Sequence, residues 1–176
     1  MEQNAKQKTT IRSQMPLKTI AKIGILGAIA AVLMLIEIPL PFAPSFYEID
    51  LSEVAVMIGA FALGVVPGIF IELVKVLLNL LLNGTTTACV GELANFVIGC
   101  AYIVPAALLY RHKKSLKNAI LGMCIGTLSM TLIGALMNLY VLLPAYVAIA
   151  NFPMEAVIDM GTKVNPAITS VETLVL

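Results

Sequence analysis

Three charged residues lie inside or beside long apolar stretches of this chain, where an ionic side chain is costly. Glu72 and Lys75 stand three positions apart within residues 68–82 (GIFIELVKVLLNLLL), and Glu92 opens another apolar stretch. A charge at the centre of a membrane-spanning helix costs about 2.5–3.5 kcal/mol on insertion scales, so such groups face a protein interior or a wet cavity. The pattern predicts an internal polar site in a membrane protein.

Glu72 and Lys75 allow two interpretations. Residues three or four apart share one face of a helix, so Glu72, Lys75 and Asn79 form a polar stripe. The stripe is either a substrate or ion site, or an internal ion pair that joins helices and binds no ligand. Opposite charges at this spacing neutralise each other locally, so the second interpretation needs no ligand.

Other polar residues mark the ends of apolar stretches. Glu92 and Asn95 lie one helical turn apart, and Asn138 lies in the outer third of a later stretch. Each asparagine is either a ligand contact or helix-joining; an interhelical hydrogen bond is worth about 0.6 kcal/mol in a membrane. For Glu92, the alternative to ligand binding is a first-turn carboxylate that interacts with the helix dipole.

Residues 39–50 (PLPFAPSFYEID) form a connection that is unusually apolar. Phe42, Phe46 and Tyr47 cluster there with three prolines. Aromatic residues at a membrane interface commonly form a belt, and the alternative here is a rigid apolar lid over a flat ligand.

No catalytic signature is present in the sequence: HExxH, GxSxG and GxxxxGK[ST] are all absent. The three cysteines and one histidine show no metal-ligand spacing. A net charge of +1 provides no general attraction for nucleic acid. We therefore expect that the protein is not an enzyme and holds no metal or cofactor. Because the sequence has no nucleotide-binding motif, uphill transport by this protein would need an ATP-hydrolysing partner.

The apolar stretches predict an all-α integral membrane protein. The chain has 176 residues, of which 60% are hydrophobic and 12% charged, against about 45–50% apolar residues in soluble proteins. A helix needs about 20 apolar residues to cross a bilayer core. We predict a polar tail at 1–16 and one helical domain over 17–176, with spans at about 17–38, 51–66, 67–82, 92–110 and 116–143 and the start of a sixth at 167–176.

Basic residues gather in the tail and again at 111–117. Four predicted spans separate these two segments, so both can lie on one side of the membrane. The positive-inside rule makes that side cytoplasmic. We expect a multi-pass protein of the cell membrane, with its N-terminus in the cytoplasm and the connections 39–50, 83–91 and 145–166 outside.

The first predicted span carries two overlapping small-xxx-small patterns, Gly24/Ala28 and Gly27/Ala31. Small residues allow another helix to approach closely. The partner helix is either within this chain or in another protein.

Four segments together resemble one transporter family. They are IEIPLPFAPSFYEIDLSEVAVMIGAFALG (36–64), IELVKVLLNLL (71–81), GELANFVIG (91–99) and MNLYVLLPAY (137–146). The chain is similar in these segments to the riboflavin-specific S component of energy-coupling factor (ECF) transporters. The resemblance implies a compact bundle of six membrane helices, of which this sequence holds five and the start of a sixth.

The resemblance also implies partners and site residues. An S component binds its vitamin from outside and delivers it when docked on a transmembrane coupling protein and two ATPases. Gly24 and Ala28 match the family's AxxxA motif for that docking, with glycine in place of the first alanine. The residues that would contact riboflavin are Leu40, Phe42, Phe46 and Tyr47 over the rings, and Asn95, Asn138 and Glu92 at the ring edge or the hydroxyl groups.

One departure from the family pattern lies at the end of the chain. The riboflavin group opens its sixth helix with P-F-N-x-x-K, whereas this sequence stops at Leu176 before such a stretch. We expect a fragment, because the final apolar run is too short to span.

The alternatives to a riboflavin-binding function are an S component for another vitamin, an intramembrane enzyme, or a structural membrane subunit whose polar groups join helices.

Overall fold

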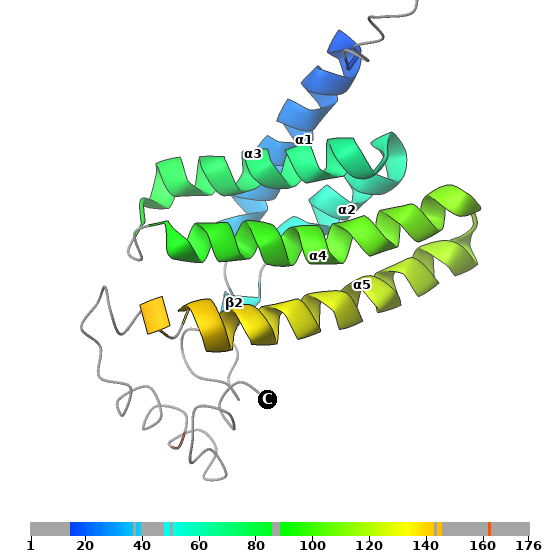
Figure 1. Ribbon diagram of the computed structural model, residues 1–176. Coiled ribbons are helices and arrows are strands. Elements are labelled where there is room, and N and C mark those ends of the chain that lie inside the picture. Colours follow the sequence, from blue (N-terminus) through cyan, green and yellow to red (C-terminus); the bar gives the residue numbers. More distant parts are fainter. Residues whose placement is uncertain are drawn as a thin grey trace, which may run out of the picture.

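The computed structural model describes residues 15–36, 38–39, 48–49, 51–85, 89–142, 144–145 and 162. This part of the chain is helical apart from one pair of two-residue strands (Figure 1). Its helices are α1 (Leu17–Met34), α2 (Ser52–Leu63), α3 (Val65–Asn83), α4 (Val90–His112), α5 (Leu116–Met137) and the π-helical turn η1 (Asn138–Leu142). The predicted all-α fold is confirmed, and the expected sixth span at 167–176 lies outside the described residues.

Four of these helices are long and apolar enough to cross a membrane: α1, α3, α4 and α5 continued by η1. With 12 residues, α2 is about 18 Å long at 1.5 Å per residue, which is short of a bilayer core of about 30 Å. Its bounds are narrower than the predicted 51–66 because Gly64, with φ of 108°, ends the helix. α3 then begins at once, and Pro67 fits its first turn, where a backbone N–H has no helical partner.

The connection after α1 contains the strand pair. β1 (Ile38–Pro39) runs antiparallel to β2 (Glu48–Ile49), with Ile38 opposite Ile49 and Pro39 opposite Glu48. α1 ends at Met34, before the predicted boundary at residue 38. Ile38 belongs to β1 and precedes Pro39, and the residue before a proline is disfavoured in helical conformation. The strand pair therefore places Pro39 and Glu48 next to each other.

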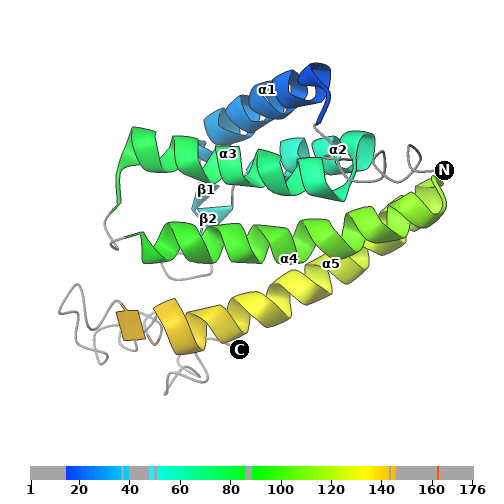
Figure 2. The same cartoon turned by 45° about the horizontal axis from the view of Figure 1, so that its top comes forward.

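α3, α4 and α5 lie side by side, each antiparallel to the next, whereas α1 is inclined to them (Figures 1 and 2). α3 packs against α4 and α4 packs against α5, while α1 packs on α2 and α3. Both views show the α2–α3 and α4–α5 turns at one end of the bundle, and the start of α4 and the end of α5 at the other (Figures 1 and 2). We call these the basic end and the polar end, because Arg111 and Lys114 adjoin the first and Glu92 and Asn138 the second.

The buried core is built largely from small side chains. Ala30, Ala60 and Ala106 are each at most 1% exposed. A Cβ added at Gly122 of α5 would lie 2.7 Å from the Ala106 carbonyl oxygen of α4, so these helices approach closely only because the position has no side chain. The close approach of α4 and α5 therefore fixes the position of Asn138, which directly follows α5, relative to α4.

Candidate functional site

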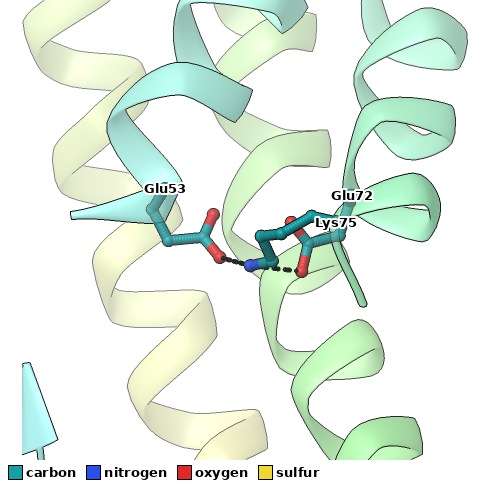
Figure 3. Close-up of polar contacts among 3 residues, drawn as sticks. All are labelled: Glu53, Glu72 and Lys75. Carbon is teal, nitrogen blue, oxygen red and sulfur yellow. Dashed lines mark hydrogen bonds and ion pairs between the residues drawn. The ribbon is translucent and has the colours of Figure 1, made fainter. Parts of the chain in front are cut away.

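Glu72 and Lys75 lie completely buried on α3, with 0% of either side chain exposed. Lys75 Nζ is 2.8 Å from Glu72 Oε1 on its own helix. The same ammonium group donates to Glu53 Oε1, 2.7 Å away in the first turn of α2 (Figure 3). The pair predicted from sequence is thus part of a three-residue ion cluster that joins α2 to α3.

The ion cluster of Glu53, Glu72 and Lys75 also contacts a third helix. A Cβ added at Gly99 of α4 would lie 2.6 Å from the Glu72 carboxyl carbon, so the carboxyl group rests directly on the α4 backbone. Two carboxylates and one ammonium group give the cluster a formal charge of −1. The close packing favours the helix-joining interpretation of Glu72 and Lys75 over a ligand site.

Glu53 is the member of the cluster that sequence reasoning missed. A carboxylate in the first turn of a helix is typical of an interaction with the helix dipole, so the position alone gives no sign of an ion pair. The Glu53 side chain is 22% exposed, less than a solvated first-turn carboxylate would be. Glu53 and Lys75 are 22 positions apart, a separation that carries no periodic signal, so only the packing of α2 on α3 reveals the contact.

Glu92 stands at the polar end, in the first turn of α4. Its Oε2 accepts a hydrogen bond of 3.2 Å from the Thr85 hydroxyl, which itself accepts one of 2.8 Å from the Cys89 amide. Cys89 has a positive φ of 68°, in the left-handed region. The carboxylate thus connects the first turn of α4 to Thr85, which follows α3, a specific contact beyond a general interaction with the helix dipole.

Asn95 and Asn138 belong to neighbouring segments at the same polar end. Asn95 lies one turn after Glu92 on α4, and Asn138 is the first residue of η1, which contacts α4. Both are half-buried. Single π-helical turns inside α-helices occur frequently at functional sites. The structure therefore gathers Glu92, Asn95 and Asn138 at one end, although a role in ligand binding stays a prediction for all three.

The expected aromatic lid residues are Leu40, Phe42, Phe46 and Tyr47, and all four lie outside the described residues. What the structure describes is the strand pair on either side of them. A lid role for these four side chains stays a prediction.

The two small-residue patterns of α1 point in different directions. Gly27 and Ala31 are buried, and a Cβ at Gly27 would lie 2.8 Å from Cβ of Val74 on α3. Gly24 and Ala28 are exposed, and a Cβ at Gly24 would meet no atom within 4 Å. The Gly27/Ala31 pattern therefore packs inside the bundle, and the Gly24/Ala28 pattern leaves an open strip on the surface.

The family assignment follows from a match over nearly the whole chain. A model of the family described as "ECF transporter, substrate-specific component" matches residues 18–175. The chain belongs to this family. As an S component it is the substrate-specific membrane subunit of a transporter, which agrees with the resemblance seen in the sequence.

This S component has relatives with assigned names. It is 38% identical over 134 residues to the riboflavin transporter RibU of Staphylococcus aureus, covering 76% of this chain and 70% of that protein. It is 33% identical over 140 residues to the riboflavin transporter FmnP of Bacillus subtilis, covering 79% and 74%. A solved structure titled "Structure and mechanism of the S component of a bacterial ECF transporter" matches with a TM-score of 0.67 and 35% identity, over 86% of this chain and 88% of that chain.

Proposed function

We propose that this chain is the riboflavin-binding S component of an ATP-driven ECF importer. The observation that carries the proposal is the identity of 38% and 33% to two proteins named riboflavin transporters, over about three quarters of the chain. Membership of the S-component family gives the class of protein, and these relatives favour the vitamin.

The proposed ligand suits the polar end of the bundle. Riboflavin combines a flat ring system with a polar edge and a hydroxylated chain, so its site should be mostly apolar with a few placed polar groups. The amides of Asn95 and Asn138 each offer two donors and an acceptor, and Glu92 offers an acceptor. We assign these three residues to the ring edge and the ribityl hydroxyls.

The apolar cover of the site comes from the connection between α1 and α2. The strand pair of Ile38–Pro39 with Glu48–Ile49 lies within this connection, on either side of the sequence 40–47. We assign Leu40, Phe42, Phe46 and Tyr47 to contacts over the flavin rings, since aromatic and aliphatic side chains remove a planar ring from water at low entropic cost.

Energy for import comes from outside this chain. We assign the exposed strip of Gly24 and Ala28 to contact with a transmembrane coupling protein, because an α1 surface without bulky side chains lets another helix approach closely. Two ATPases complete the proposed importer, so this subunit binds and delivers its substrate without doing chemistry on it.

The test is direct binding to the purified chain in detergent. We expect the protein to co-purify with a flavin absorption spectrum and to quench the fluorescence of added riboflavin in a saturable titration. Thiamine and biotin serve as controls and should not displace the flavin. A saturable response to either of them, with none to riboflavin, would reassign the subunit to another vitamin.

A further inference from the structure

A cleft of about 350 Å³ opens at the basic end of the bundle, away from the proposed riboflavin site. The last turn of α2, the first turn of α3 and the last turn of α4 form its walls. Arg111 and Lys114 line this cleft together with apolar residues. None of the roles assigned above uses it.

The inner part of the cleft is apolar and packed. Ala60 and Ala107 line it and are 1% and 2% exposed, so the α2 and α4 backbones meet behind it. Phe61 and Tyr110 form one side, with their ring centroids 4.7 Å apart and their planes inclined at 37°. Such a wall accommodates hydrocarbon rather than a hydrated ion.

The outer part of the cleft is positive. Arg111 and Lys114 are exposed at the end of α4 and just beyond it. The first turn of α3 contributes the positive end of its dipole, whereas the last turns of α2 and α4 contribute negative ends, so the net positive charge comes from the two side chains. A phosphate accepts bidentate hydrogen bonds from a guanidinium group and pairs with an ammonium group as a point charge.

No acidic side chain that the structure describes neutralises these cations. Glu53 starts α2 while the cleft is at its end, and Glu72 is held by Lys75. Glu92 lies about 28 Å from Arg111 along α4 at 1.5 Å per residue. The positive charge at the cleft therefore stays available for an anion.

We propose that this cleft binds an anionic phospholipid of the leaflet that the basic end faces. The phosphate lies between Arg111 and Lys114, and an acyl chain lies against Phe61 and Tyr110. The apolar wall favours a lipid over free phosphate, because inorganic phosphate gains nothing from that surface. Basic pockets between membrane helices on the cytoplasmic side are a known class of anionic lipid site.

The experiment compares lipids that differ only in charge. The purified, delipidated full chain is titrated with phosphatidylglycerol or phosphatidylcholine of the same acyl chains, and bound lipid is counted by native mass spectrometry. We expect phosphatidylglycerol to be retained at least tenfold more strongly. Equal retention of the two lipids would overturn the proposal.

Two matched double variants locate the site. Arg111→Gln with Lys114→Gln should lower phosphatidylglycerol retention at least tenfold. Lys113→Gln with Lys117→Gln removes the same charge from the same end of the bundle but not from the cleft, and should change retention less than twofold. Equal losses in both would show diffuse attraction to the basic end and would overturn the cleft assignment.

A final experiment distinguishes binding of the whole lipid from binding of its phosphate group alone. Inorganic phosphate alone is titrated against the delipidated protein and followed by the thermal unfolding midpoint. We expect no stabilisation by phosphate at concentrations where phosphatidylglycerol stabilises. Stabilisation by phosphate that matches the lipid would overturn the assignment to a phospholipid, and an unfolding midpoint for each variant near that of the parent confirms that it folds.

Discussion

At the scale of single residues, Lys75 sets the charge balance of the bundle interior. It is the cation of the ion cluster and is within 2.8 Å of both carboxylates. Because all three side chains lie in or beside the bundle interior, water screens their electrostatic attraction poorly. Removal of one member therefore lowers the stability of the fold strongly. The cluster joins α2 to α3 while Glu72 rests on α4.

Lys75→Met tests this balance. The variant leaves the Glu53 and Glu72 carboxylates without their cation, so we expect the free energy of unfolding to fall by about 3–5 kcal/mol. The measurement is unfolding in detergent followed by circular dichroism. Lys22→Met, at an exposed position of α1, is the control and should change stability by about 0.5 kcal/mol or less.

A triple variant completes the test. Glu53→Gln, Glu72→Gln and Lys75→Met together remove every charge of the cluster, and we expect much of the lost stability to return. A Lys75→Met protein as stable as the parent would contradict an ion cluster that holds helices together.

Gly99 and Gly24 offer a matched pair of glycine-to-alanine changes. Gly99→Ala forces the Glu72 carboxyl group away from α4, and overpacking of this kind costs about 1–3 kcal/mol. Gly24→Ala enters open space and should leave stability unchanged or slightly raised, since alanine favours a helix. Comparing the two unfolding midpoints checks the prediction, and equal shifts would refute close packing at Gly99.

Asn138→Ala tests the proposed ligand contact. Loss of the amide leaves a polar group of bound riboflavin unsatisfied, which costs about 1–3 kcal/mol, or roughly 5–150-fold in Kd. Flavin fluorescence titration measures the change. Asn118→Ala is the matched control, because Asn118 lies in the first turn of α5, at the basic end. An unchanged Kd for Asn138→Ala would remove this residue from the site.

At the scale of elements, α1 has one buried side and one side that is open in the described structure. One side buries Ile23, Gly27 and Ala30, and the other presents Gly24 and Ala28. Gly24 and Ala28 are exposed, and a Cβ at Gly24 would meet no atom within 4 Å, so packing among the described helices does not require small residues there. Contact with a neighbouring helix of the proposed importer remains our assignment for this strip.

Ala28→Leu should therefore separate binding from transport. A bulky side chain on the strip should block close helix approach and lower ATP-dependent riboflavin uptake into vesicles by more than tenfold when the partner subunits are present. Riboflavin binding to the isolated chain should not change. Cys124→Leu adds bulk at an exposed position of α5 and is the control; equal losses of uptake in both variants would argue against a docking strip.

At the scale of the whole molecule, charge is divided between the two ends of the bundle. The exposed cations Arg111 and Lys114 adjoin one end, and the carboxylate of Glu92 stands at the other. The positive-inside rule predicts that the first end faces the cytoplasm. In that orientation the polar end faces outward, where the proposed ligand arrives.

Cysteine labelling checks this orientation. Cys89 is exposed at the polar end, beside the start of α4, and should react with a membrane-impermeant maleimide in intact cells. Lys113→Cys, made together with Cys89→Ser, should react only after the membrane is permeabilised. The reverse pattern would invert the topology and move the proposed riboflavin site to the cytoplasmic side.

The sequence by itself determined the membrane class, the helical fold and the family. Apolar stretches long enough to cross a bilayer are local properties of composition, and the family motifs are local strings. The burial of Glu72 and Lys75 was also foreseeable, because a charge within an apolar stretch must avoid lipid.

Only the tertiary structure decided which residues meet. The contact of Glu53 with Lys75 joins two helices whose separation in the sequence follows no helical period. The contact of the Glu72 carboxyl group with Gly99 depends on how closely α3 approaches α4. The two small-residue patterns of α1 look alike in sequence and differ only in what packs against them. Pairing between elements depends on the geometry of the packed bundle, which no local pattern of residues contains.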